Sequence, residues 1–361
     1  MEQYVNERDK KYLNKLREEV IPSLPEFCED FFIGISSVTT VLTRYNYGTD
    51  LIAFFNYLVS PGAVFDGMEV CDISLNDLKL IKSRDIEHFV DYISGYYTPS
   101  GEYVKNSDKA KARKLSAVRS LFKYLYTHEL ISENVTTKVA MPKPREKEII
   151  RLENTEVNDM FDLLETGNAF ISDQQNAYNN NNTKIRDNAI ITLLLGTGIR
   201  VSELVGLNVN DVNFANKSFI VTRKGEKRSI LYLNDDIIEV LQQYLEYRKA
   251  QLTKKKIDPS TVDAFFLSLQ NKRITVRAVE VMVKKYSEIV TPLKKISPHK
   301  LRSTYGTALY RQTNDIYVVA EVLGHKDINT TKKHYAAISE DIKKTAADKV
   351  NFRKKTDETD E

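Results

Sequence analysis

Cysteine is nearly absent from this chain, and so are the marks of secreted and membrane proteins. The two cysteines in 361 residues, Cys28 and Cys71, have no neighbour at the spacing of a metal or redox site. They are expected to be packing residues in a reducing compartment. No run approaches the ~18 consecutive apolar residues of a membrane helix, and the charged residues 1–15 lack a signal peptide's apolar core. A soluble, cytoplasmic protein is predicted.

The chain also lacks a strong charge of either sign. Its 53 basic and 50 acidic residues leave a net charge of +3, so any affinity for nucleic acid must come from local clusters of basic residues. No phosphate-binding P-loop is present, which argues against chemistry driven by a nucleoside triphosphate. The length predicts two domains, because single cores seldom grow beyond ~250 residues.

The first third of the chain has apolar residues at helical spacing. Residues 40–59 show this pattern and end at a Ser-Pro-Gly sequence, and residues 83–96 and 105–128 repeat it. We predict a helical N-terminal domain over residues 1–140, with a charged leader at its start.

The helix predicted at 105–128 has a basic face opposite an apolar one. Its candidate DNA-contacting residues are Lys109, Lys111, Arg113, Lys114 and Arg119. Contacts of such side chains with phosphates give affinity and salt dependence without sequence information. The alternative is an ordinary solvated surface, which is the more common reading of a single charged helix.

A linker is predicted at residues 141–150, where two prolines and five charges occur without periodicity. A second domain is expected over 151–350, followed by a charged tail at 351–361. Within it, the asparagine-rich residues 173–186 predict a polar surface loop. The next segments, 187–195 and 201–207, are apolar helices separated by Gly196-Thr197-Gly198.

Two basic candidates lie in the first half of this second domain. Arg200 stands where the two apolar helices meet, an unusual place for a guanidinium, although an ion pair with Glu203 one turn later is an equally good reading. Lys224 lies in a basic turn between strands predicted at 218–222 and 230–233. Lysine-rich turns are most often only soluble turns.

The sharpest motif is Ser-Pro-His-Lys-Leu-Arg at 297–302. Ser297 suits the N-cap of a helix and Pro298 its first position, which puts His299 in the first turn and Arg302 on the same face. An imidazole and a guanidinium beside the positive end of a helix make a good oxyanion site.

A histidine-rich segment follows this motif. The helix predicted to end at Leu323 has Gly324 as a C-cap, and His325 comes directly after it. Three of the five histidines, His299, His325 and His334, fall in this region, and Tyr335 closes it. Zinc binding is the rival reading, but the cysteines are distant and no compact ligand set occurs. No metal or other cofactor is expected.

Taken together, these motifs resemble those of the tyrosine site-specific recombinases and phage-type integrases. The matching strings are Thr197-Gly198-Ile199-Arg200-Val201-Ser202-Glu203-Leu204, the Lys224 turn, His299-Lys300-Leu301-Arg302, Leu323-Gly324-His325 and Tyr335. The resemblance covers about 150–345. The N-terminal part resembles the family's helical core-binding (SAM-like) domain, and its leader resembles the XerS type of Xer recombinase. The implied fold is mainly α with a small antiparallel β-sheet.

The resemblance also implies a mechanism. Tyr335 would attack a DNA phosphate and form a 3′-phosphotyrosine, while Arg200, Arg302, His299 and His325 stabilise the negative charge. Lys224 would be the general acid. Glu203 would orient Arg200. A homotetramer clamped on two duplex sites would exchange strands through a Holliday junction, with neither metal nor ATP.

Two departures from the family pattern occur. The tyrosine commonly lies nine residues after the second histidine, whereas Tyr335 lies ten after His325 and His334 takes the ninth place. Tyr335 is still preferred, because histidine cannot form the expected phosphotyrosine. Ser303 replaces a histidine found in many relatives.

The biological role stays open at this stage. A Xer-like recombinase that resolves chromosome dimers in cell division, acting at the nucleoid, is preferred over an integrase of a mobile element. A DNA-binding regulator that no longer cuts is less favoured, and a type IB topoisomerase is a minor option. A helix predicted at 339–350 would dock on its own or on a neighbouring protomer.

Overall fold

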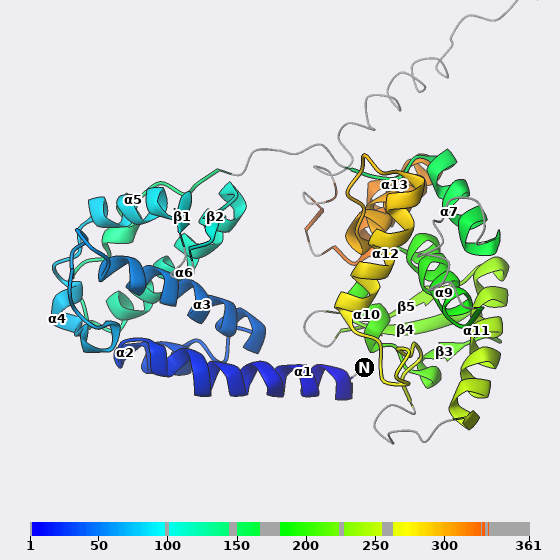
Figure 1. The fold of residues 1–361 in the computed structure, drawn as a ribbon, viewed down its shortest axis with the longest axis horizontal. Helices are drawn as coiled ribbons and strands as arrows, with labels where there is room; N and C mark the ends of the chain where they lie inside the picture. Colours follow the sequence, from blue (N-terminus) through cyan, green and yellow to red (C-terminus); the bar gives the residue numbers. More distant parts are fainter. Residues whose placement is uncertain are drawn as a thin grey trace, which may run out of the picture. The chain divides into compact units, whose positions relative to one another are not determined.

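A computed structural model describes residues 2–97, 101–143, 150–166, 181–223, 227–254, 263–325, 327, 328 and 331. The chain divides into two compact units, one of Gln3–Lys147 and one that begins at Glu148. The division falls within the segment predicted as a linker. Figure 1 shows the helices and strands of each unit.

The first unit is helical, apart from a two-stranded hairpin. Its helices are α1 (Glu2–Lys15), α2 (Phe27–Gly34), α3 (Val41–Leu58), α4 (Leu75–Leu78), α5 (Ser83–Tyr92) and α6 (Asp108–Thr127). The strands of the hairpin are β1 (Gly95–Tyr97) and β2 (Tyr103–Lys105). Shorter elements are a π-helical turn at Leu16–Val20 and 3-10 turns at Ile21–Ser23, Val70–Asp72 and Val135–Lys138. Helices α3 and α6 confirm two of the predicted helices. The third ends early, at Tyr92, because β1 begins at Gly95.

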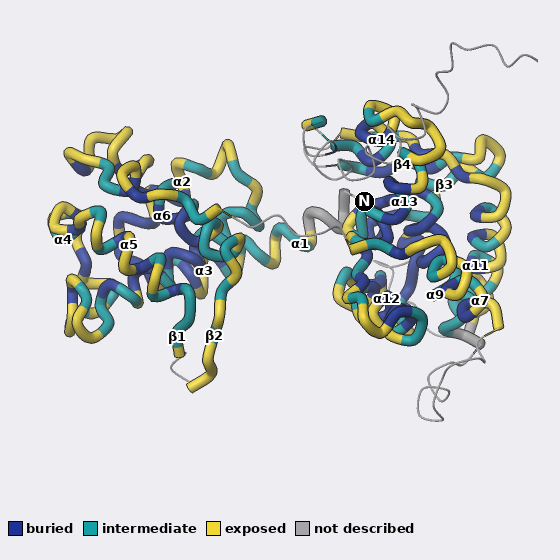
Figure 2. Tube along the Cα trace, turned by 90° about the horizontal axis from the view of Figure 1, so that it is seen from above, coloured by how far each residue is buried: buried dark blue, intermediate teal, exposed yellow. Residues whose placement is uncertain are grey.

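Helices α3 and α6 pack against each other in the middle of the first unit. Both begin at a hydroxyl N-cap, since Thr40 accepts from Thr43 N and Ser107 accepts from Ala110 N. Phe54 of α3 is fully buried and meets Phe89 of α5 edge-on at a ring-centroid distance of 5.0 Å. Figure 2 shows the buried interior of these helices and the more exposed β1–β2 hairpin that extends from them.

The second unit is mainly helical, and one of its helices packs against several others. Its helices are α7 (Asn154–Thr166), α9 (Asn181–Thr197), α10 (Val201–Gly206), α11 (Asp235–Lys254), α12 (Val276–Val290), α13 (Pro298–Thr313) and α14 (Ile316–Leu323), with a 3-10 turn at Val209–Asp211. Helix α9 packs against α7, α11 and α13. It starts six residues before the predicted helix, so the loop predicted at 173–186 is wrong for 181–186, which form the first turns of α9.

An antiparallel sheet of three strands completes this unit, in the order β3 (Val212–Asn213), β4 (Ser218–Thr222) and β5 (Arg228–Tyr232). Strand β4 has the predicted bounds, and β5 lies two residues earlier than predicted at its start. The alternation of Phe219 and Val221 with exposed residues puts one face of the sheet into the core. The mainly helical fold with small antiparallel sheets confirms the predicted class. Among the described helices, none is long and apolar enough to cross a membrane.

Candidate active site

Arg200 lies at a sharp break between α9 and α10. The break turns at Gly198, whose φ of +61° is unfavourable for other residues, and a Cβ at Gly198 would lie 2.5 Å from the ring of Tyr305. Arg200 follows as the N-cap residue of α10, with an extended backbone (φ −72°, ψ 145°). Gly196 lies within α9, which continues to Thr197, so Gly198 alone makes the close junction at which Arg200 begins a new helix.

Glu203 holds Arg200 at two points. Its Oε2 accepts from the Arg200 backbone N at 3.0 Å, and its Oε1 accepts from Nη1 at 2.8 Å. The Glu203 side chain is 5% exposed and that of Arg200 is 37% exposed. The structural ion pair considered as the alternative reading of Arg200 is thus present. Because the carboxylate is buried and the guanidinium is partly open to solvent, the pair orients Arg200 and leaves part of it accessible.

Arg302 and His299 both come from α13. Pro298 occupies the first turn as predicted, and Ser297 is the N-cap residue, although its side chain makes no cap hydrogen bond. His299 is exposed, whereas Arg302 is 4% exposed. The Arg302 Nη1 donates to the Gly198 carbonyl at 2.5 Å, and its Nη2 donates to the Leu323 carbonyl. The guanidinium is therefore fixed between the α9–α10 break and the end of α14.

His325 lies directly after the C-cap of α14. Gly324 has left-handed backbone angles (φ 61°, ψ 49°) and confirms the predicted C-cap. The backbone N of His325 donates to the Ala320 carbonyl at 2.9 Å, and its Nδ1 lies 2.8 Å from Oγ1 of the fully buried Thr331. This contact fixes the imidazole ring and leaves Nε2 on the other side of it.

The carbonyl end of α14 brings the two predicted arginines together. Arg302 binds the carbonyl of Leu323, and Arg200 binds the next one, that of Gly324, through Nη2 at 3.0 Å. Adjacent carbonyls therefore place the two guanidiniums side by side, next to His325 in the chain. His299 lies three residues before Arg302 on α13. The structure thus brings Arg200, Arg302 and His325 together, and His299 is carried by the same helix as Arg302. Lys224 and Tyr335, together with His334 and the helix predicted at 339–350, lie outside the described residues.

Sequence reasoning missed a third arginine at this end of α14. Arg223, directly after β4, donates from Nη1 to the Glu321 carbonyl at 3.1 Å and from Nη2 to the Val322 carbonyl at 2.7 Å. Burial lowers the pKa of Arg223 from its ordinary value, Glu203 opposes this, and the like charge of Arg200 adds to the lowering. The only sequence signal was its place beside Lys224 in a turn where most residues are basic.

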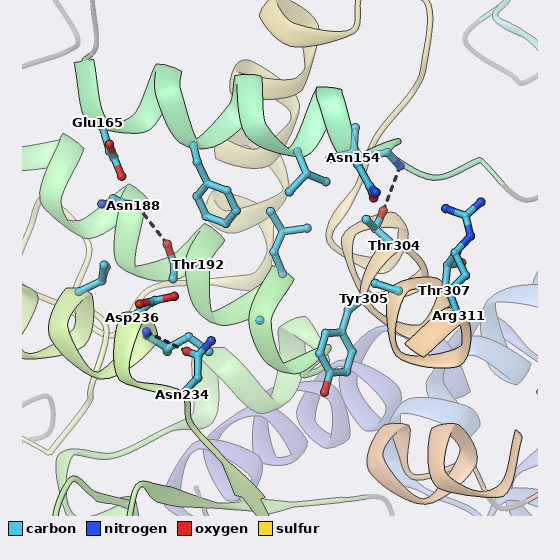
Figure 3. Close-up of a pocket in the computed structure, with 18 residues that line it drawn as sticks. Asn154, Glu165, Asn188, Thr192, Asn234, Asp236, Thr304, Tyr305, Thr307 and Arg311 are labelled. Atoms are coloured by element: carbon cyan, nitrogen blue, oxygen red, sulfur yellow. Dashed lines mark hydrogen bonds between the residues drawn. The ribbon is translucent and has the colours of Figure 1, made fainter. Parts of the chain in front are cut away.

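One cavity in the second unit does not include these groups in its lining. It has a volume of about 510 Å³ and is lined by residues of α7, α9, α11 and α13, among them Thr192, Tyr305 and Arg311 (Figure 3). Neither the two paired arginines nor the two histidines of the site line it. The oxygen of Thr304, on its wall, accepts from Leu152 N at 3.0 Å and so attaches the start of the unit to α13. The candidate site is instead a partly open surface, which suits a large substrate.

The structure modifies the expected basic face of α6. Lys114 is buried, with Nζ 3.3 Å from Asp50, so the expectation that it faces outward is wrong. Arg113 also binds Asp50, at 2.6 Å, while 48% of its side chain stays exposed. Lys111 pairs with Asp108 at 2.9 Å, and Arg119 donates to a backbone carbonyl.

Lys109 is exposed to solvent. In the part of the chain that the structure describes, no group of three histidine, cysteine or carboxylate side chains is placed to hold a metal ion. Contacts with DNA at α6 remain a prediction.

Comparison with known proteins identifies the family. The profile of the phage integrase family matches residues 151–341, more than half of the chain. The chain belongs to the phage integrase family. This match spans the α9–α10 break, the sheet, α13 and α14, which are the elements that hold the site.

Two of the most similar relatives are tyrosine recombinases. Tyrosine recombinase XerC of Caldanaerobacter subterraneus subsp. tengcongensis is 34% identical over 86% of this chain and 82% of its own. Tyrosine recombinase XerS of Streptococcus uberis is 33% identical over 92% of this chain and 97% of its own. The chain is a site-specific tyrosine recombinase of the Xer type, as the sequence motifs predicted.

Solved structures agree in fold. XerH recombinase bound to its palindromic difH substrate, after cleavage, has a TM-score of 0.64 at 19% identity and covers 85% of this chain and 80% of its own. Tn1549 transposon integrase bound to a circular intermediate DNA has a TM-score of 0.61 at 15% identity, over 88% and 98% of the two chains. Both structures contain DNA.

Proposed function

We propose that this recombinase cleaves DNA by attack of Tyr335 on a backbone phosphate, which the Arg200–Arg302 pair holds. The observation that carries this proposal is the convergence of the two guanidiniums on the adjacent carbonyls of Leu323 and Gly324, next to His325. The carbonyls orient the arginines without neutralising their charge. An anion is the natural ligand for such a pair.

The phosphate would bind at the accessible part of the arginine pair. A guanidinium has five N–H donors, and Arg200 uses one on Glu203 and one on Gly324. The remainder can turn to the non-bridging oxygens, where negative charge builds up in the transition state. His299, one turn before Arg302, and Nε2 of His325 would add directed hydrogen bonds to the same oxygens.

The reaction would exchange one phosphodiester for another. The Tyr335 oxygen forms a bond to phosphorus, the bond from phosphorus to the 5′ oxygen breaks, and that oxygen takes a proton from Lys224. The tyrosine must lose its own proton, and because its ordinary pKa is near ~10 it needs a nearby base or cation, for which we propose His299. The reverse reaction joins a new strand without ATP.

The proposed assembly is a homotetramer on two duplex sites, with strand exchange through a Holliday junction. The DNA in the XerH and Tn1549 integrase structures supports DNA as the partner. Both units would contact the duplex. The exposed Lys109 and Arg113 on α6 would contact phosphates.

We favour a chromosomal role, resolution of chromosome dimers at the nucleoid in the cytoplasm. The similarity to XerS from Streptococcus uberis extends over 97% of that protein, including its N-terminal part. An integrase of a mobile element is the second candidate, since the Tn1549 integrase shares the fold. The two functions use the same chemistry and differ in the DNA site.

Covalent trapping tests the proposal. Wild type, Tyr335→Phe and His334→Ala are incubated with nicked DNA that carries the candidate chromosomal site, and with the flanks of nearby mobile elements, and then run on denaturing gels. A protein–DNA band that disappears only with Tyr335→Phe supports the assignment of the nucleophile. Tight binding without a band on any of these DNAs would favour the regulator that does not cut. The DNA that gives the band distinguishes the chromosomal role from the mobile-element role.

A further inference from the structure

Arg223 has contacts that its position at a surface turn does not require. Its two terminal nitrogens reach across to α14 and bind two consecutive carbonyls, those of Glu321 and Val322, at 3.1 and 2.7 Å. The last carbonyls of a helix lack the usual partner four residues later, although that of Glu321 also accepts from the Gly324 backbone N at 2.9 Å. A forked guanidinium is well suited to two neighbouring oxygens, whereas a lysine ammonium is a single point of charge.

The carbonyls of residues 321–324 accept hydrogen bonds from three arginines. Arg223 takes the first two, Arg302 takes that of Leu323, and Arg200 takes that of Gly324. The carbonyl end of a helix carries partial negative charge, which favours cations there. Arg223 is therefore the outer member of a row whose other two members are the proposed phosphate-binding arginines.

Gly324 permits the close approach of Arg223. A Cβ at position 324 would lie 1.7 Å from Nη1 of Arg223 and 2.3 Å from Cζ. The left-handed backbone of Gly324 is needed for the C-cap, and its missing side chain is needed for the guanidinium. The two features together fix where Arg223 lies on α14.

The main chain of Arg223 is fixed as well. Its backbone N donates to the Lys227 carbonyl at 2.8 Å, one pair beyond the register pair Thr222 and Arg228 of β4 and β5. Arg223 thus closes the base of the hairpin and anchors that base to α14. Lys224 follows Arg223 directly in the sequence.

We propose that Arg223 is a positioning residue for the reaction. Its hydrogen bonds to the carbonyls of Glu321 and Val322 hold the start of the hairpin turn beside the Arg200–Arg302 pair, so that Lys224 can protonate the leaving oxygen. The inference rests on the proposed function, in particular on the general-acid role of Lys224. Arg223 itself transfers no proton and touches no reacting atom.

A leaving group that needs no proton separates this role from a merely structural one. When sulfur replaces the bridging 5′ oxygen at the cleaved bond, the tyrosine–phosphorus bond still forms and the phosphorus–sulfur bond breaks, but the thiolate leaves without a proton because thiols have a pKa near ~8.5. Loss of a general acid costs about 10²–10⁴-fold in rate on ordinary DNA. Loss of its positioning residue should cost a part of this, about 10–100-fold.

The experiment measures single-turnover cleavage by the full-length protein on oxygen-bridged and sulfur-bridged versions of a DNA site that the wild type cleaves. The variants are Arg223→Ala, Arg223→Lys, Lys224→Ala, Arg200→Ala and, as a matched arginine of the same hairpin that is exposed on β5, Arg228→Ala. Near-ultraviolet circular dichroism checks that each variant is folded. Arg223→Ala and Lys224→Ala should be slow on oxygen and recover most of their rate on sulfur, with Arg223→Lys intermediate on oxygen. Arg200→Ala should stay slow on both, and Arg228→Ala should resemble wild type.

Suppose that Lys224→Ala recovers its rate on the sulfur-bridged substrate but Arg223→Ala loses the same factor in rate on both substrates. Arg223 would then act only on the structure, and the inference would be overturned. A wild-type rate for Arg223→Ala on oxygen would overturn it too. If Lys224→Ala does not recover on sulfur, the general-acid role proposed for Lys224 is wrong, and the inference fails with it.

Discussion

Basic side chains are concentrated in two places, helix α6 of the first unit and the end of α14 in the second, and their partners differ. On α6, the buried Asp50 holds Arg113 and Lys114, and Asp108 holds Lys111. At α14, three arginines are held mainly by backbone carbonyls, and the Glu203 carboxylate also binds Arg200.

The difference in partners decides what the positive charge can do. A carboxylate orients a cation and offsets part of its charge, whereas a carbonyl orients it and leaves the charge intact. A row of guanidiniums on a helix end can therefore be ordered before substrate arrives and still attract a phosphate. Local counts of lysine and arginine do not distinguish these two cases.

The largest predicted effect is on Arg302, which donates to the carbonyls of Gly198 and Leu323. Arg302→Ala should lower the rate of covalent complex formation by about 10³-fold, because it removes forked donors from the transition state, while most DNA affinity remains. Arg302→Lys keeps the charge but loses a forked donor, and it should be slower than wild type by about 10²-fold, the lower end of the cost of one lost donor. Gel-shift and trapping assays measure the two quantities. Normal cleavage by either variant would remove the basis for the proposed phosphate site.

Asp50→Ala should destabilise the first unit by about 3 kcal/mol, since it leaves Lys114 buried without its carboxylate. Hydrogen exchange of α3 and α6 amides reports this locally. The matched double variant, Asp50→Leu with Lys114→Met, should recover most of the loss because no buried charge is left unpaired. An equally unstable double variant would mean that packing, and not charge pairing, explains the effect.

Gly324→Ala should cost about 2 kcal/mol of stability in the second unit, from the left-handed backbone angle and from the crowding of Arg223. In an Arg223→Ala background the crowding is absent and only the backbone cost should remain. A thermal-unfolding cycle over the four proteins measures the coupling. Strict additivity would contradict the contact between Gly324 and Arg223.

The smallest effect concerns DNA affinity at α6. The double variant Lys109→Ala with Arg113→Ala should reduce the slope of log affinity against log salt by about 2, at ~0.9 per phosphate contact. Lys114→Met should leave the slope unchanged, because that amine is buried on Asp50. Fluorescence anisotropy at several salt concentrations measures both. A change with Lys114→Met and none with the double variant would reverse the proposed roles.

The sequence predicted the class of fold and the positions of Arg200, His299, Arg302 and His325, because helix caps and glycine breaks are local signals. It did not predict Arg223, whose partners on α14 lie about a hundred positions later in the chain and are main-chain atoms that any residue supplies. It also overstated the basic face of α6, since the partner of Lys114, Asp50, comes from another helix. Contacts between distant elements carry no local pattern.

The most direct test of the account is to map the covalent bond between protein and DNA. Wild-type protein is trapped on a nicked site, digested with protease and nuclease, and analysed by tandem mass spectrometry for the peptide that bears a nucleotide. The account predicts a single phosphotyrosyl adduct at Tyr335, lost in Arg302→Ala at equal DNA occupancy. An adduct at His334 or at another tyrosine, or an undiminished adduct in Arg302→Ala, would contradict it.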